Sequence, residues 1–329
     1  MNSTKLKKFD FIKYHFWALL VCGVILLTGG LVWIFGGLNL SIDFTGGTII
    51  NVQTGDEIED KDVYNDYMQQ IEDVMATHGL SISKELVEGT GENMSIQIRY
   101  QDVDGKTVEE MTDISANFLT DLRATLGEDV TVSTGERITA TASSSLLVNA
   151  LLAIAIASVL IMIYVGIRFR GLNGLCTIFG MLLDVALVFA FTIIFQIEID
   201  SVFIAALITI LGYSINNNVV VFDRIRENQI NYPNASYKTI VNKSLHQSLT
   251  RTIIMTVTTL LAVIVLACVG LQGIDSFIYP IIIGIAIGLL TLLFVVSPMY
   301  SYLVDKVDAK KKNIKRVRNN ESEKEEVEA

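Results

Sequence analysis

Cysteine is nearly absent from this chain of 329 residues, since only Cys22, Cys176 and Cys268 occur. All three lie inside long apolar runs, where a cysteine ordinarily packs as a small buried hydrophobe. Cysteines placed in this way form neither the framework of a disulfide-rich domain nor a zinc-type cluster. The sequence therefore gives no support for a fold held together by disulfides or by a metal.

Histidine is equally rare, and His15, His78 and His246 lie too far apart in the expected topology to form one site. The sequence also lacks a Ser-His-Asp set and a Gly-rich phosphate loop, so hydrolytic or metal chemistry has no basis in it. We therefore expect a protein that is not an enzyme and that needs no cofactor.

Charged residues make up only 18% of the chain, against 51% apolar residues, which is too apolar for one soluble domain of this length. The formal net charge of −10 is unevenly spread. Residues 43–137 hold 21 acidic and 6 basic residues, and the rest of the chain is net basic. This asymmetry argues against a nucleic-acid partner and for an acidic portion that is set apart from the rest.

Apolar residues gather in six runs, each long enough to cross the roughly 30 Å hydrocarbon core of a bilayer as a helix. The runs cover about 14–36, 146–166, 173–195, 202–222, 253–272 and 277–303. The first run follows a basic segment, but it is long and no A-x-A-like cleavage site follows it. We interpret it as a retained anchor, and we expect a multi-pass membrane protein.

Basic residues mark alternate ends of these runs. They cluster before the first run, between the second and third, between the fourth and fifth, and after the sixth. By the positive-inside rule, the N-terminus (1–13), a loop at 223–252 and a charged tail at 304–329 are cytoplasmic. Residues 37–145 then form a domain on the opposite side.

The pattern of this outer domain alternates between strand and helix periodicity. The predicted elements are strands or helices at 48–53, 58–78, 81–87, 94–100, 108–126 and 130–137, in the order β-α-β-β-α-β. This order is that of a ferredoxin-like α+β unit, in which two helices cover one face of the sheet. The other face would remain available for a partner or for a passing polypeptide.

Several motifs appear in a fixed order along the chain. They are Asp43-Phe44-Thr45-Gly46-Gly47, Gly212-Tyr213-Ser214-Ile215-Asn216, Phe222-Asp223-Arg224-Ile225-Arg226, Ser248-Leu249-Thr250-Arg251-Thr252 and Ser297-Pro298. Together, and over essentially the whole chain, they resemble the SecD/SecF family of bacterial protein-export subunits, and among these the SecF branch.

This resemblance implies a fold related to the resistance-nodulation-division transporters and a location in the bacterial plasma membrane. It also implies a SecD-like partner in a heterodimer, association with the SecYEG channel, and an unfolded polypeptide as the substrate. Family members use the proton gradient to draw polypeptide outward after the motor SecA has pushed it. Two rival functions are a half-transporter that exports small molecules or lipids, and a scaffold without ion coupling.

Ionisable residues within a membrane span cost about 2.5–3.5 kcal/mol each on insertion scales, so they are functional candidates. Here they are Asp184 in the third run, with Asp223 and Arg251 near the cytoplasmic boundary. A structural role is favoured for Asp223, which ends the fourth run among basic residues. Arg251 fits either snorkelling to the interface or a polar seam inside the bundle.

The chain departs from the family at two of these positions. Asn217 stands where the family usually carries an aspartate partnered by the arginine at Arg251, and Leu183 replaces a histidine before Asp184. Asn217 and its neighbour Asn216 can form hydrogen bonds or offer a carbonyl to a cation, but they cannot carry a proton. Three hypotheses follow: the proton site lies in the SecD-like partner, Asp184 is the titrating group, or the complex is coupled to sodium or to no ion.

Small residues point to close helix packing. Gly29, Gly30, Gly36 and Gly37 lie in or beside the first run, and the sixth contains further glycines at 284 and 288. Such residues let helix backbones approach closely, so packing is a more economical interpretation than a ligand site.

Overall fold

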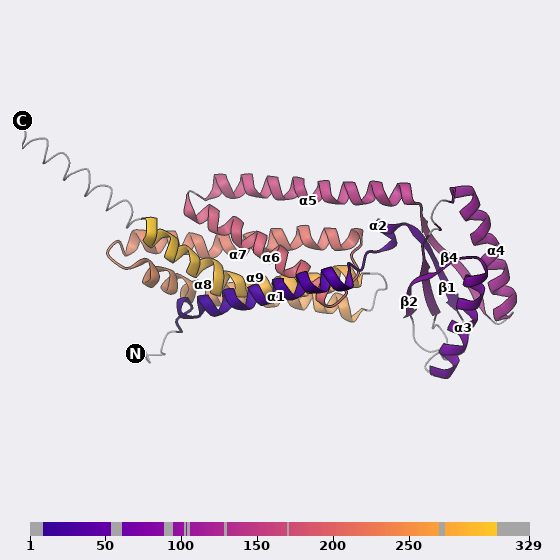
Figure 1. Cartoon of the computed structure of the whole chain (residues 1–329). Helices are drawn as coiled ribbons and strands as arrows, with labels where there is room; N and C mark the ends of the chain where they lie inside the picture. Colours follow the sequence, from indigo (N-terminus) through magenta and orange to yellow (C-terminus); the bar gives the residue numbers. More distant parts are fainter. Residues whose placement is uncertain are drawn as a thin grey trace, which may run out of the picture. The chain divides into compact units, whose positions relative to one another are not determined.

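The computed structural model describes residues 9–53, 61–88, 95–101, 103, 106–127, 130–169, 171–269 and 274–307. The first eight residues, Arg170 and the tail after Val307 lie outside this part of the chain. The chain divides into two compact units (Figure 1). One contains the residues up to 38, 154–197 and those from 202 onward, and the other contains 39–153 with 198–201.

Six helices are long and apolar enough to cross a membrane, which confirms the predicted number of spans. They are α1 (His15–Gly36, preceded by a short 3-10 turn at Ile12–Tyr14), α5 (Ala140–Arg168), α6 (Leu172–Ile194), α7 (Ser201–Asn231), α8 (Tyr237–Cys268) and α9 (Asp275–Thr291). After α9, a π-helical turn at Leu292–Val296 leads into a last helical segment that reaches Val307.

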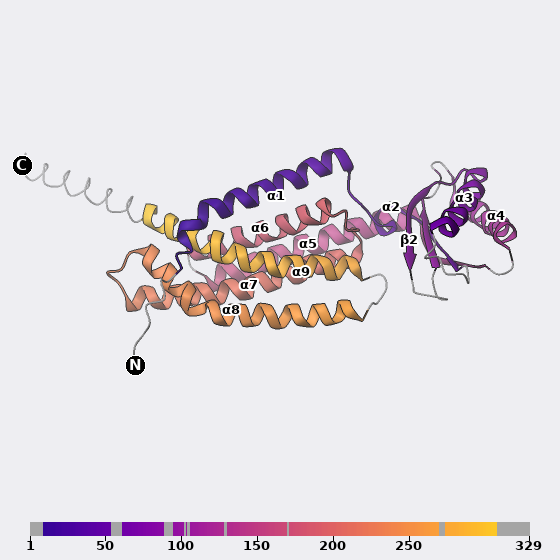
Figure 2. The same cartoon turned by 90° about the horizontal axis from the view of Figure 1, so that it is seen from below.

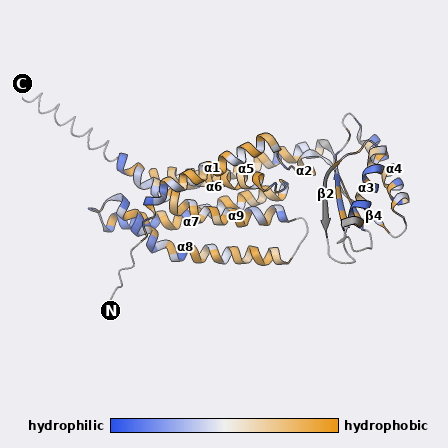
Figure 3. Ribbon diagram, turned by 60° about the horizontal axis from the view of Figure 1, so that its bottom comes forward, coloured by the Kyte–Doolittle hydropathy of each residue, from blue (hydrophilic) through white to orange (hydrophobic). Residues whose placement is uncertain are grey.

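The membrane unit has buried and exposed helices. In α6 and α7, half of the most apolar stretch is buried, and in the span Asp275–Val307, which begins with α9, 61% of it is buried. The corresponding stretches of α1, α5 and α8 are only 6%, 0% and 11% buried. Figure 2 shows α6 between α1 and α9, with α8 on the other side of α9. Orange, hydrophobic residues dominate α5 and α8 in Figure 3. The exposed apolar faces are therefore suited to contact with lipid or with a partner helix.

Small residues bring the central helices together. A Cβ atom added at Gly29 of α1 would lie 2.7 Å from the Cβ of Ala190 in α6, and one at Gly284 of α9 would lie 2.6 Å from Ile210 of α7. Gly180 of α6 meets Val296 in the same way, at 2.5 Å. Close packing was predicted for Gly29 and Gly284, and the structure confirms it there, whereas an added Cβ at Gly30 meets no atom within 4 Å.

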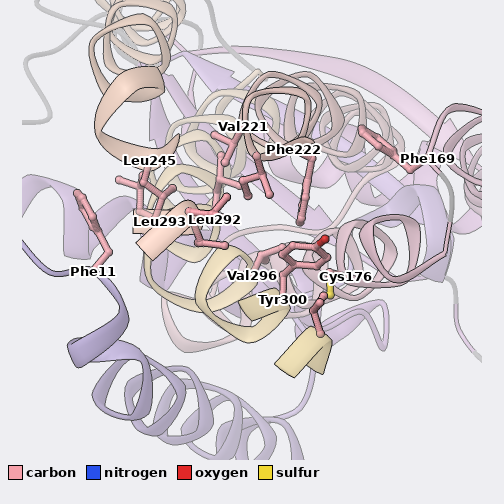
Figure 4. Close-up of a cluster of buried hydrophobic side chains, with 14 of the residues drawn as sticks. Phe11, Phe169, Cys176, Val221, Phe222, Leu245, Leu292, Leu293, Val296 and Tyr300 are labelled. Carbon is pink, nitrogen blue, oxygen red and sulfur yellow. The ribbon is translucent and has the colours of Figure 1, made fainter. Parts of the chain in front are cut away.

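A large apolar cluster fills one end of the membrane unit (Figure 4). Its buried members come from the residues before α1, from the region of α5 through α8, and from the π-helical turn and last helical segment after α9. Those labelled in Figure 4 are Phe11, Phe169, Cys176, Val221, Phe222, Leu245, Leu292, Leu293, Val296 and Tyr300. Cys22 and Cys176 are buried, as their apolar surroundings predict, whereas Cys268 is exposed at the end of α8, which corrects the prediction for that residue.

The predicted loop at 223–252 is mostly helical, which corrects the sequence interpretation. The helix α7 continues to Asn231 and α8 begins at Tyr237, so only a short turn separates them. Asn228 explains the extension, because its Nδ2 donates to Ser244 Oγ and to Gln247 Oε1, each at 2.7 Å. Polar residues therefore pair between two helices instead of forming a loop.

The second unit contains a four-stranded antiparallel sheet in the order β2-β3-β1-β4. Its elements are β1 (Gly47–Gln53), α3 (Lys61–Thr77), β2 (Ile82–Glu88), β3 (Ser95–Tyr100), α4 (Val108–Leu126) and β4 (Thr131–Ile138). The helices α3 and α4 pack on one face through a core that includes Ile50, Ile98 and Phe118, all fully buried. The predicted ferredoxin-like α+β fold is confirmed.

Candidate functional site

The third-span aspartate is the centre of a buried polar cluster. Asp184 of α6 is 1% exposed. Its Oδ2 accepts a hydrogen bond of 2.6 Å from Ser214 Oγ of α7, and its Oδ1 accepts one from Thr291 Oγ1 of α9. No lysine, arginine or histidine among the described residues forms an ion pair with it. Three central helices thus converge on one carboxylate that lacks a cationic partner in the described part of the chain.

The asparagine run in α7 continues this cluster. Asn218 donates from Nδ2 to the Ser214 carbonyl at 2.8 Å and to Ser214 Oγ at 3.3 Å. Its Oδ1 has no hydrogen-bond partner among the described residues, and neither has any polar side-chain atom of Asn217. Asn217 and Asn218 are 1% and 2% exposed, whereas Asn216 is exposed. Buried amides without partners are rare, and they indicate a functional position or a missing ligand.

Arg251 and Asn217 do not interact. Arg251 is exposed on α8, and Asn217 forms no hydrogen bond with it. Arg251 borders a groove of about 300 Å³ that it shares with Asp223, Arg224 and Glu227. The polar seam of α8 instead consists of buried small residues, and Thr256 within it accepts a hydrogen bond of 2.9 Å from Tyr213.

The remaining residues of the fourth-span motif form surface ion pairs. Asp223 accepts from Arg168 Nη2 at 2.5 Å, and Glu227 accepts from Arg224 Nη1 at the same distance. Arg226 is exposed and lines a cavity of about 430 Å³ together with Arg168 and Asp223. These contacts favour the structural role that the sequence suggested for Asp223.

The glycine pair after the first span forms a tight connection. Residues Ile42–Thr45 form one helical turn, α2, and Gly46 and Gly47 follow with φ angles of 75° and 140°. A Cβ at Gly47 would lie 2.5 Å from the Tyr100 carbonyl oxygen, so only glycine fits there. Asp43 Oδ2 accepts a hydrogen bond of 3.0 Å from the amide of Ser201, at the start of α7.

Glu110 and Tyr232, which both lie outside the spans, have shifted pKa values. The pKa of Glu110 is lowered, chiefly because the backbone N–H of Thr107 donates to its carboxylate in the capping box of α4. The pKa of Tyr232, between α7 and α8, is lowered by its contact with Lys243. Both shifts arise from local contacts on the surface.

Sequence reasoning identified Asp184 and Asn217 but missed Ser214, Asn218 and Thr291 as a group around the carboxylate. A hydroxyl in an apolar run carries little signal, because serine and threonine can bond to the carbonyl of the preceding turn. Only the meeting of three helices, which the sequence does not encode locally, selects these residues.

The fold and the cluster define a class: a multi-pass membrane protein whose first two spans flank a ferredoxin-like domain and whose core holds a buried carboxylate. The family described as "Protein export membrane protein SecD/SecF, C-terminal" matches residues 119–306, and "SecD/SecF GG Motif" matches residues 32–57. The chain belongs to the SecD/SecF family of protein-export membrane proteins.

Curated relatives support this assignment. The protein translocase subunit SecF of Sebaldella termitidis is 32% identical over 80% of this chain and 81% of its own length. The protein translocase subunit SecF of Escherichia coli O157:H7 is 27% identical over 89% of this chain and 87% of its own length. The predicted assignment to the SecF-like translocase subunits is therefore confirmed.

Solved structures agree with the fold. SecDF from Thermus thermophilus, described as a translocon-associated membrane protein, matches with a TM-score of 0.73 and 26% identity over 91% of this chain. A SecDF in a super-membrane-facing form matches with a TM-score of 0.61 and 29% identity over 93% of it. The chain spans about 40% of each of those longer SecDF chains.

Proposed function

We propose that this chain is the SecF-like half of a two-subunit membrane complex that helps to draw unfolded polypeptide through the SecYEG channel. The observation that carries the proposal is the match to about 40% of a SecDF chain, which includes all six spans and the domain between the first two. A SecD-like subunit would supply the rest. The chain itself would act as a mechanical subunit and not as an enzyme.

The lipid-exposed helices are consistent with a partner. The most apolar stretch of α5 has no buried residue, and its exposed side chains include Leu151, Ile156 and Ile163. Such a face tolerates lipid, yet it can equally pack against helices of a second subunit without loss of polar contacts. Both termini would lie in the cytoplasm of a bacterium, because the basic residues flank alternate span ends.

The ferredoxin-like domain would act on the exported polypeptide. The helices α3 and α4 cover one face of its sheet, whereas the other face carries polar side chains such as Asn51, Gln97 and Ser133. A polar sheet face can hold an extended chain briefly without trapping apolar segments. This surface suits a substrate that must be released after each step.

Ion coupling would pass through Asp184 and not through Asn217 and Arg251. Asp184 is buried where α6, α7 and α9 meet, so a change in its charge state would alter the packing of all three helices. Arg251 is exposed and forms no hydrogen bond with Asn217. Of the three hypotheses for the coupling site, this arrangement supports one in which this chain itself carries an ion-responsive group.

Translocation in reconstituted vesicles tests the proposal. Vesicles that contain SecYEG, SecA, a SecD-like subunit and this chain should protect more of a radiolabelled preprotein from protease when an ion gradient is imposed. Omission of this chain should remove the gradient-dependent part. Equal protection with and without the chain would overturn the proposal, and gradient-independent stimulation would indicate the scaffold function.

A further inference from the structure

The charge of Asp184 has no counter-charge in the described part of the chain. A carboxylate that is 1% exposed, with no basic partner among the described residues, is strongly unfavourable in its ionised form unless a positive charge neutralises it. Two hydrogen bonds from hydroxyl groups reduce this penalty but do not remove it. A proton or a bound cation would balance the site.

The atoms around Asp184 are mainly oxygens. Ser214 Oγ and Thr291 Oγ1 contact the two carboxylate oxygens directly. The Nδ2 of Asn218 lies 3.3 Å from Ser214 Oγ, and this hydrogen bond holds the carboxamide of Asn218 beside the cluster. The Oδ1 of Asn218 accepts no hydrogen bond from the described residues. Carboxylate, hydroxyl and amide oxygens are the ligands that hard cations prefer. A proton on the carboxyl group can be donated to one acceptor only, whereas a cation can bind several of these oxygens at once.

A gap lies beside the carboxylate. A Cβ atom added at Gly288 of α9 would lie 3.5 Å from Asp184 Oδ2, and no other atom outside the local helix backbone lies within 4 Å of it. This position therefore leaves space of about the size of a methyl group next to the negative charge.

We propose that Asp184, Ser214, Thr291 and the carboxamide of Asn218 form a binding site for a small monovalent cation, of which Na⁺ is the fitting example. A single positive charge neutralises the one carboxylate, whereas a divalent ion would leave an uncompensated charge in a region of low dielectric. Binding would tie α6, α7 and α9 together through shared ligands. The inference deepens the proposed function, because it names the ion to which that function would respond.

Thermal unfolding of the purified full-length chain in nanodiscs tests the inference without any export assay. At constant ionic strength, the unfolding midpoint should rise with NaCl concentration and not with KCl or choline chloride, because only a bound ion stabilises the folded state by mass action. Asp184→Asn should abolish the Na⁺-dependent rise. An equal midpoint in Na⁺, K⁺ and choline would overturn the proposal and favour a proton at the site.

A substitution at Gly288 tests the site without removing the charge of Asp184, and a substitution at Gly212 serves as its control. Gly288→Ala should fill the gap beside Asp184 and reduce the apparent Na⁺ affinity at least tenfold, although the added methyl group makes only ordinary contacts. Gly212→Ala in α7 is the matched control, since an added Cβ there meets no atom within 4 Å. The proposal fails if Gly288→Ala keeps the full Na⁺ response, whatever the behaviour of Asp184→Asn.

The two proposals fail separately. Na⁺-dependent stabilisation without any effect on translocation would disprove the proposed function and leave the cation site intact. Gradient-stimulated translocation by a chain whose stability does not respond to Na⁺ would disprove the cation site alone.

Discussion

At the scale of single residues, the hydroxyl of Ser214 has two tasks. It donates to Asp184 Oδ2 and accepts from Asn218 Nδ2, so it links the carboxylate to the asparagine run of α7. Its removal leaves a buried charged acceptor with one donor fewer. Losses of this kind cost about 1–3 kcal/mol, and more when the group that is left unpaired is charged.

We expect Ser214→Ala to lower the free energy of unfolding by at least about 1 kcal/mol. Equilibrium unfolding in mixed detergent micelles with increasing dodecyl sulfate measures the change. Thr209→Val is a control on the same helix, because Thr209 is exposed and its hydroxyl donates to the Ala205 carbonyl of its own helix. Equal stabilities of the two variants would show that Ser214 does not support the cluster.

Glu110 makes the stability of the outer domain depend on pH. Its pKa is lowered in the folded state, so the unfolded chain binds the proton more tightly than the folded chain. The resulting stabilisation is present above the unfolded pKa of about 4.3 and is lost as the pH falls through the lower folded value.

Glu110→Gln should therefore lower the unfolding midpoint at pH 7, and the difference from the unsubstituted chain should vanish as the solution becomes strongly acidic. Circular dichroism at a series of pH values follows the transition. Glu109→Gln removes the same charge from the first turn of α4 and leaves the capping box intact. A difference that grows toward acidic pH would have the wrong sign and would contradict the assignment.

At the scale of elements, the contact between α1 and α6 depends on Gly29. A side chain there would meet the Cβ of Ala190 at 2.7 Å and its Cα at 2.9 Å, so the two helices would have to separate. Overpacking of this kind typically costs about 1–3 kcal/mol. Gly29→Val should destabilise the membrane unit by an amount in this range, as measured by unfolding in dodecyl sulfate.

The neighbouring Gly30→Val is the matched control, because a Cβ at Gly30 has no atom within 4 Å. Both substitutions add the same β-branched side chain to the same helix, so differences in helix propensity cancel. Equal destabilisation would mean that α1 does not pack against α6 through Gly29.

The elements themselves could be predicted because each rests on a local pattern. Six apolar runs predict six helices, and alternation in β1 and β3 predicts strands whose inward residues, such as Ile50 and Ile98, are fully buried. The continuation of α7 and α8 beyond the apolar runs was missed, since it depends on Asn228 bonding to Ser244 and Gln247 of the facing helix. Long-range pairs of this kind leave no periodic trace in the sequence.

The candidate site was predictable only in part, for a similar reason. The high cost of burial singled out Asp184, and the family resemblance drew attention to Asn217. Thr291 lies 107 residues from Asp184 in the chain, and its role appears only once α6 and α9 are packed together. The resemblance pointed instead to Arg251, which is exposed on α8 and forms no hydrogen bond with Asn217.

At the scale of the whole molecule, the acidic domain and the basic span ends make one topological prediction. Residues 43–137 carry a strong excess of acidic side chains. Acidic residues contribute little to the orientation of a protein in the membrane, which is set by the lysines and arginines near the span ends. The turn between α7 and α8 should therefore lie in the cytoplasm, and α4 of the outer domain should lie on the opposite side.

Single cysteines introduced into a background with alanine at positions 22, 176 and 268 test this topology. Ala124→Cys places a thiol on the exposed face of α4, and Asn234→Cys places one in the turn between α7 and α8. A membrane-impermeant maleimide should label the first in intact spheroplasts and the second only after permeabilisation. The opposite pattern would place the domain in the cytoplasm, where it could not receive a polypeptide that emerges from the channel, and would exclude the proposed role in export.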